Sequence, residues 1–152
     1  EDWGAAYKAT DGSTALSGSL IFAESDGNIP APEPGLYVMD FDMKNLTYQL
    51  TAVESVTFAG LNDNWAETEM TQSAENPEIF TAEFVKEKET PWGVKVLINH
   101  DWNLFFGGGN GVLMLGHSDS TTGFDGDNEL TVGETYILKV DLGKQTYSYS
   151  LK

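Results

Sequence analysis

The feature that most constrains the fold of this chain is an internal repeat. Sliding the sequence along itself by 99 positions, without a gap, makes eleven of the first fifty positions identical. Chance alone would give roughly three such identities. Shared alternation of two β-sheets does not explain repeated pairs such as Asp-Trp and Thr-Tyr. The positions that recur 99 residues later are Asp2, Trp3, Gly12, Leu16, Ser19, Asp26, Gly27, Tyr37, Asp42, Thr47 and Tyr48.

The repeat predicts an uneven division of the chain. A unit near 99 residues means that the first copy supplies only its last fifty. We therefore expect residues 1–52 to be the C-terminal half of a repeat module and residues 53–152 to be a complete module. A half-module exposes unpaired strand edges, which folded proteins normally cover. Either residues 1–52 pack onto the complete module or a second chain covers them, and a homodimer is the favoured alternative.

Period-two alternation predicts the fold class. In ETYILKVDL, the side chains of Tyr136, Leu138 and Val140 share one face, and Tyr37 and Met39 repeat this pattern in the first copy. Turn residues occupy the connections DMKN and DLGKQ, and no stretch holds a helical period. We predict an all-β, antiparallel, immunoglobulin-like β-sandwich with one complete module and half of a preceding repeat. Further strands are expected in VESVTFAG, IFTAEF and PWGVKVLI.

Charge and composition exclude several classes of partner. The chain has 24 acidic and 8 basic residues, a formal net charge of -16, and no cysteine. A surface with this negative charge repels nucleic acid and anionic lipid. The absence of cysteine excludes thiolate chemistry. No apolar run approaches the length of a membrane span. We therefore expect no nucleic-acid partner and no span in this stretch of sequence.

Motifs for metals and cofactors are weak. GGGNG lacks the Lys-Ser or Lys-Thr of a phosphate loop and is better explained as a hairpin turn. DGDNE, at residues 125–129, lacks the spacing of a calcium loop. His100 and His117 have no neighbouring ligands at metal spacing, which favours two surface residues. We expect neither a cofactor nor a metal.

Three residues of the complete module could bind a sugar. Trp65 follows the first strand in the polar loop FAGLNDNW, and Trp102 begins the turn after the strand GVKV. Lys95 alternates with Val94 and Val96, so it should point away from the core. The C–H face of a sugar stacks on an aromatic ring while its hydroxyls meet Lys and Asn. The alternative is that both tryptophans pack within the fold.

The order of these motifs provides a family resemblance. AGLNDNW, then the strand IFTAEF, then GVKV, DW and a glycine-asparagine turn resemble the starch-binding domains of glucoamylases and cyclodextrin glucanotransferases. The ending GDNELTVGETYILKVDLGKQTYSYSL more closely resembles the modules of SusE and SusF, starch-binding lipoproteins of gut Bacteroidetes. The resemblance implies that residues 53–152 bind polysaccharide, most naturally an α-glucan, through Trp65, Lys95 and Trp102, with Asn103 or Asn110 nearby.

The same resemblance implies a location. A protein of this family sits on the outer membrane at the cell surface, held by a lipid anchor outside the present sequence, within a glycan-uptake complex. The first copy keeps Trp3 and Tyr7, but the positions that match Trp65 and Lys95 precede its first residue. It is not expected to form a whole site alone.

A catalytic role and a purely structural role are the two other function classes for this chain. A glycoside hydrolase needs two carboxylates facing each other across a cleft. The paired acids, Glu67 with Glu69 and Asp40 with Asp42, fall on turns or alternate strand positions, and no nucleophile triad is evident. We therefore expect no enzyme. A structural or adhesion module without a glycan ligand is the stronger alternative, and Trp92 is expected mainly to pack.

Overall fold

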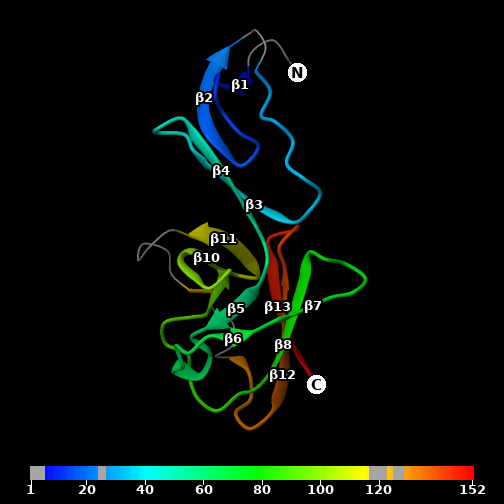
Figure 1. Ribbon diagram of the computed structural model, residues 1–152. Helices are drawn as coiled ribbons and strands as arrows, with labels where there is room; N and C mark the ends of the chain where they lie inside the picture. The colour runs from blue at the N-terminus through cyan, green and yellow to red at the C-terminus, as the bar shows by residue number, and fades with distance from the viewer. Residues whose placement is uncertain (1–5, 24–26, 117–122, 125–128) are drawn as a thin grey trace. The chain divides into compact units, whose positions relative to one another are not determined.

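The computed structural model describes residues 6–23, 27–116, 123–124 and 129–152. The chain divides into two compact units, unit 1 at Glu1–Val53 and unit 2 at Glu54–Lys152. Every strand pair is antiparallel, and the described residues contain no α-helix, only the short 3-10 turn η1, Leu61–Asp63 (Figure 1). The prediction of an all-β, antiparallel fold is confirmed.

Unit 1 is one four-stranded sheet in the order β1-β2-β4-β3. Its small core consists of Ala9, Leu20, Tyr48 and Leu50, against which Ile29, Tyr37 and Leu46 pack. These core residues come from the three adjacent strands β1, β2 and β4. The strands are β1 Ala6–Ala9, β2 Ser17–Ala23, β3 Tyr37–Asp42 and β4 Thr47–Ala52.

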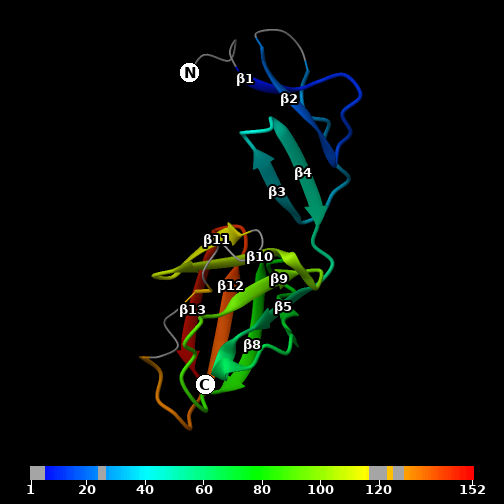
Figure 2. The same cartoon turned by 90° about the vertical axis from the view of Figure 1, so that its left-hand side faces the viewer.

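Unit 2 has nine strands in the order β6-β5-β9-β10-β11-β13-β12-β8-β7. The sheet folds over so that β5, β9 and β10 lie in one layer and β8, β12 and β13 in the other (Figure 2). The segment 68–72 joins the two layers, since β6 pairs with β5 and β7 pairs with β8. The strands are β5 Val56–Ala59, β6 Thr68–Glu69, β7 Thr71–Gln72, β8 Ile79–Val85, β9 Lys95–Ile98, β10 Asp101–Gly109, β11 Val112–Gly116, β12 Thr135–Asp141 and β13 Thr146–Leu151.

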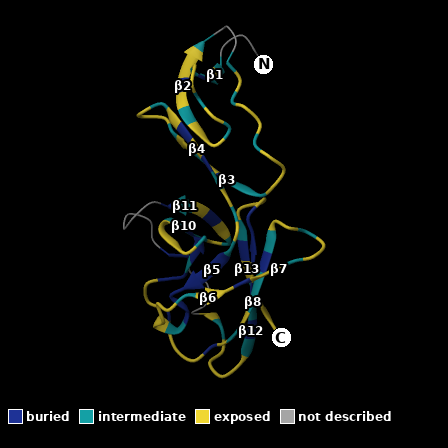
Figure 3. Ribbon diagram, in the orientation of Figure 1, coloured by how far each residue is buried: buried dark blue, intermediate teal, exposed yellow. Residues whose placement is uncertain are grey.

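The core of unit 2 lies between its two layers. The alternation that predicts a shared face in β12 is reproduced, because Leu138 and Val140 are fully buried and pair with Ala82 and Phe80 of β8. Figure 3 shows this concentration of buried residues in unit 2. Val56, Phe58, Val96, Ile98, Phe106 and Leu113 complete the buried apolar set on the facing strands.

The repeat is visible in the pairing of strands. Unit 1 has the order β1-β2-β4-β3, and the last four repeat strands of unit 2 have the matching order β10-β11-β13-β12. Tyr37 pairs with Ala52, and the residues 99 positions later, Tyr136 and Leu151, also pair. All six residue pairs of β3 and β4 recur in β12 and β13 at this offset.

The gap-free alignment is wrong for the second repeat strand. Thr47 pairs with Ser19, whereas its counterpart Thr146 pairs with Val112, so β2 matches β11 at an offset of 93. Leu20 and Leu113 then coincide, and both are buried. Their amide N–H groups donate to the equivalent carbonyls of Leu46 and Gln145. Burying this leucine fixes the register, and the longer β1–β2 connection of unit 1 accommodates the difference.

Several of the identities that indicated the repeat cannot be compared in this structure. Leu16 and Leu115, although identical, do not occupy equivalent strand positions at the corrected offset. Asp2, Trp3, Asp26, Ser118, Asp125 and Gly126 lie outside the described residues.

Candidate functional site

The candidate residues gather around the outer face of the β5–β9–β10 layer. Lys95 pairs with Ala59, and Leu97 pairs with both Thr57 and Phe105, so alternation places these five side chains on one face. Ala59, Leu97 and Phe105 form a buried cluster there. The Lys95 ammonium lies 4.1 Å from the centroid of the Phe105 ring, a cation–π contact on this face.

A loop held by glycine and asparagine positions Trp65. Gly60 ends β5 with a φ of 105°, and a Cβ there would lie 2.4 Å from the Gly93 carbonyl oxygen. Asn62 then fixes the loop, because its amide donates to Val85 O at 2.7 Å and its carbonyl accepts from Glu87 N at 2.9 Å. In the motif LNDNW, therefore, Asn62 is a structural residue, whereas the Trp65 side chain is 37% exposed.

A tight hairpin positions Trp102. The turn between β9 and β10 consists of Asn99 and His100, both with positive φ, at 54° and 60°. Two such residues between paired strands are typical of a type I′ hairpin, and Asn and His tolerate this conformation better than most residues. Trp102 is thus the second residue of β10, and the expectation that it begins the turn is wrong.

The two tryptophans lie side by side. Their ring centroids are 6.4 Å apart and the ring planes are inclined by 46°. Trp102 is 40% exposed, close to the value for Trp65. The distance falls within the range of direct aromatic contacts. The rings therefore touch each other while each leaves part of its surface open to solvent.

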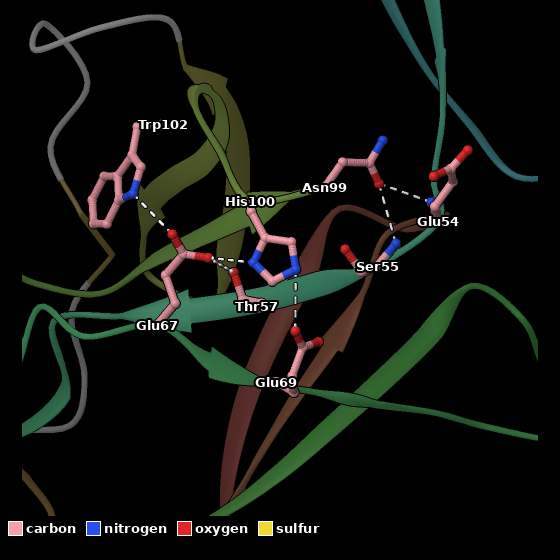
Figure 4. A network of polar contacts seen from close by, with 8 residues as sticks. All are labelled: Glu54, Ser55, Thr57, Glu67, Glu69, Asn99, His100 and Trp102. Carbon is pink, nitrogen blue, oxygen red and sulfur yellow. Dashed lines mark hydrogen bonds and ion pairs between the residues drawn. The ribbon is translucent and has the colours of Figure 1, made fainter.

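Glu67 is the centre of a polar network beside the pair (Figure 4). Its Oε1 accepts a hydrogen bond of 2.9 Å from the indole N–H of Trp102. Its Oε2 accepts one of 3.0 Å from the Thr57 hydroxyl and lies 2.7 Å from His100 Nδ1. The other ring nitrogen of His100 lies 3.2 Å from Glu69 Oε1. The hydrogen bond from its indole N–H to Glu67 thus fixes the orientation of the Trp102 ring.

The protonation of Glu67 follows from these contacts. Partial burial alone would raise its pKa, but the hydrogen bonds from His100, Thr57 and Trp102 lower the pKa below its ordinary value. The side chain is therefore a carboxylate near neutral pH. A general acid of a glycosidase needs the opposite shift.

The two candidate asparagines lie at opposite ends of β10. Asn103 stays near Trp102, and its amide nitrogen lies 3.2 Å from Asp101 Oδ1, which also accepts its backbone N–H. Asn110 follows the last residue of the strand, in the turn with Gly111, at a φ of 53°. The structure thus brings Trp65 and Trp102 into contact, with Asn103 directly after Trp102, Lys95 on the outer face of the same layer and Asn110 beyond the far end of β10.

Sequence reasoning missed Thr57, Glu67 and His100 as parts of the site. In the sequence, Glu67 stands out only as half of an acid pair and His100 only as a surface residue. The signal that could have found Glu67 is the alternation of side chains along a strand. Glu67 and Glu69 are two residues apart in the sequence, and Glu69 pairs with Thr57 across the sheet. Period-two spacing therefore places both carboxylates on the face that carries Thr57.

Other candidate features do not join this site. Trp92 is 69% exposed, so the expectation that it mainly packs is not supported by its burial. Gly107–Gly109 belong to β10, and only Asn110 and Gly111 make the predicted hairpin turn. Within the described ranges no group of His, Asp and Glu side chains could hold a metal ion. His117 and residues 125–128 of DGDNE lie outside the described residues.

A hollow of about 620 Å³ lies elsewhere in unit 2. Its walls include Phe58, Asn62, Glu83 and Lys88, and neither tryptophan of the pair lines it. The tryptophan site is therefore an exposed surface rather than part of this hollow. No helix in the described part of the chain is long and apolar enough to cross a membrane.

Comparison with known proteins gives one match. The family model described as a domain of unknown function (DUF8037) matches residues 1–52. That range lies within unit 1, whereas every candidate site residue lies in unit 2. No curated protein and no solved structure matches the chain significantly.

Proposed function

We propose that unit 2 is a non-catalytic polysaccharide-binding module whose platform is the Trp65–Trp102 pair. The observation that carries the proposal is the pairing of two partly exposed indole rings, whose centroids are 6.4 Å apart. An apolar ring surface next to hydrogen-bonding groups suits a sugar, which has apolar C–H faces and polar edges. Asn103 and Lys95 are the nearby candidates for contacts with hydroxyl groups.

The ligand class follows from the shape of the platform and from the family resemblance. Rings inclined by 46° present a curved surface rather than a flat one. A curved platform suits a helical chain such as an α-glucan better than a flat, ribbon-like chain. With the likeness to SusE and SusF modules, this supports a starch-binding role at the outer surface of a Bacteroidetes cell, within a glycan-uptake complex.

The alternative is a structural or adhesion module in which the tryptophans only pack. Their ring contact and the bond from Trp102 to Glu67 would serve that role equally well. The two functions differ in what the exposed ring surfaces do. Only the binding function needs those surfaces to meet a ligand.

Affinity electrophoresis in an α-glucan gel separates the two functions. Stacking of a sugar on one indole is worth about 1–2 kcal/mol, so Trp65→Ala and Trp102→Ala should each weaken binding about tenfold. Trp92→Ala is the matched control, because this exposed tryptophan lies outside the pair and its loss should leave migration unchanged. If both platform variants migrate like the wild type and only their melting temperatures fall, the binding function is wrong.

A further inference from the structure

The hollow of about 620 Å³ in unit 2 lies where one edge of β8 loses its partner strand. β7 pairs with β8 only as far as Thr81, since residues 68–69 pair with β5 instead, as β6. Beyond Thr81 no strand among the described residues pairs with this edge, and residues 83–85 line the hollow. All of the lining residues belong to unit 2, and the volume is typical of small-molecule pockets.

The backbone of Glu83 offers hydrogen-bonding groups to this hollow. The Lys86 N–H donates to Glu134 O on the β12 side, whereas Val85 O accepts a hydrogen bond of 2.7 Å from Asn62 on the other side. Backbone groups of successive strand residues point to opposite edges, so those of Glu83 point the same way as those of Val85. The N–H and C=O of Glu83 are therefore one donor and one acceptor at the wall of the hollow.

The side chains that line the hollow combine apolar and polar surface. Phe84 lies against Tyr136 on the core side of β8, with ring centroids 6.1 Å apart, and Phe58 and Leu61 add further apolar surface. An apolar surface beside hydroxyl, amide, carboxylate and ammonium groups matches the C–H faces and hydroxyl edges of a sugar. The polar side chains of the walls are Asp63, Asn64, Thr68, Glu83, Glu87 and Lys88.

We propose that this hollow is a second saccharide site, which takes a short neutral oligosaccharide or the end of a glucan chain. The inference rests on the proposed function and adds a separate site to the tryptophan platform. The carboxylates of Asp63, Glu83 and Glu87 outnumber the ammonium of Lys88 on its walls. Carboxylates accept hydrogen bonds from sugar hydroxyls but repel the charge of a uronic acid, which favours a neutral ligand.

The short free edge of β8 favours a compact ligand over an extended peptide. The pairing of Thr71 with Thr81 closes the edge at one end, and Asn62 occupies Val85 O at the other. Between them only Glu83 directs its backbone groups outward, so an added peptide strand would gain only about two hydrogen bonds. The hydroxyls of a sugar can instead use the side chains of the walls.

One loop separates the hollow from the platform. Asn64 lines the hollow, and the next residue, Trp65, belongs to the platform. In the same way Thr68 lines the hollow, whereas Glu67 accepts the hydrogen bond of the Trp102 indole. The two sites are therefore made of different side chains, and a residue of the hollow can be changed without replacing any platform residue.

Titration of the nitrogen-15-labelled full chain with maltose, followed by NMR, tests the second site. The Glu83 backbone amide should shift, and it should still shift when Trp65→Ala and Trp102→Ala are combined to remove the platform. A Glu83 shift that disappears in this double variant would be an effect transmitted from the platform and would overturn the second site. Indole shifts without a Glu83 shift would overturn it and leave the proposed function intact. No shift of any of these signals would overturn both.

A matched pair of variants tests whether the hollow itself holds the sugar. Thr68 and Thr71 are exposed threonines of the same segment, and only Thr68 lines the hollow. Thr68→Phe should fill the hollow and abolish the Glu83 shift while both indole shifts remain, whereas Thr71→Phe should keep all three. Equal behaviour of the two variants would contradict the site. Glucuronate should leave the Glu83 amide unmoved, and a shift as large as that with maltose would contradict the neutral ligand class.

Discussion

Units 1 and 2 contain the same four strands in the same order, yet their equivalent side chains have different surroundings. Leu138 in unit 2 is fully buried, and Met39 at the equivalent position in unit 1 is 51% exposed. The difference comes from strands that unit 2 has and the described part of unit 1 does not, namely β5 and β9 in the facing layer and β8 beside β12. A repeat sequence therefore sets strand pairing, while the second layer determines which apolar residues become core.

The comparison extends to function. The candidate glycan platform of unit 2 depends on Trp65, Glu67 and Trp102, and the first two lie in the half of the module that unit 1 does not repeat. Unit 1 instead offers an apolar sheet face. The repeat thus carries the proposed glycan platform in unit 2, whereas the equivalent sheet of unit 1 carries partly exposed apolar residues such as Met39 and Phe41.

The largest expected effect compares core truncation at equivalent positions. Leu138→Ala leaves a cavity in a closed core and should lower the free energy of unfolding by about 2–5 kcal/mol. Met39→Ala removes a side chain that already meets solvent and should cost less than about 1 kcal/mol. Urea unfolding followed by circular dichroism, at a concentration where the chain is monomeric, measures both. An equal decrease in the free energy of unfolding for Leu138→Ala and Met39→Ala would contradict the difference in burial between the two units.

An intermediate effect compares the two glutamates beside the platform. Glu67→Ala deprives the buried Thr57 hydroxyl and the Trp102 indole of their acceptor, which should cost about 1–3 kcal/mol of stability. Glu69→Ala removes only an exposed contact with His100 and should cost less than about 1 kcal/mol. Glycan affinity should also fall for Glu67→Ala alone. If the Glu69 variant loses as much affinity, Glu67 has no special part in orienting Trp102.

The smallest expected effect is a dependence on pH that both units share. The pKa values of Glu67 in unit 2 and Asp42 in unit 1 both lie below their ordinary values of 4.5 and 3.8. For Asp42 the main cause is the hydrogen bond from the Asn45 backbone N–H. A lowered folded pKa gives stability that is present above the unfolded value and is lost as pH falls through the folded one.

Melting temperatures measured between about pH 6 and pH 3 test this sign. Stability should fall on acidification, and Glu67→Gln, which cannot titrate, should flatten part of that fall. Asp42→Asn should flatten another part, because the two carboxylates are independent sites in different units. A wild type that becomes more stable on acidification would contradict the assignment of both groups.

The sequence predicted the fold class well because alternation and turns are local signals. Tyr37, Thr47 and their counterparts at Tyr136 and Thr146 gave correct registers. The offset of β2 was not predictable from identities, because register follows the burial of Leu20, which depends on contacts with other strands. Residue identities alone favoured the wrong alignment of β2 with β11.

The candidate site was predictable only in part. Both Trp65 and Trp102 were predictable as candidates, and the structure brings them together, although Trp102 lies in β10 rather than in a turn. The role of Glu67 was hidden, since its three partners come from β5, the β9–β10 turn and β10, which are distant in sequence. A network assembled across strands has no local pattern from which it can be predicted.

The most direct measurement of the central claim is a titration of the tryptophan indole N–H signals by NMR. Adding a maltooligosaccharide to the nitrogen-15-labelled chain should shift the signals of Trp65 and Trp102, which form the platform. Trp92 and Trp3 should keep their positions. The Trp102 signal is identified by its loss in Trp102→Ala, and its N–H should remain bonded to Glu67 in the complex. Shifts confined to Trp65 and Trp102 would support a glycan platform in unit 2, whereas no shift of either signal, or equal shifts of all four, would contradict it.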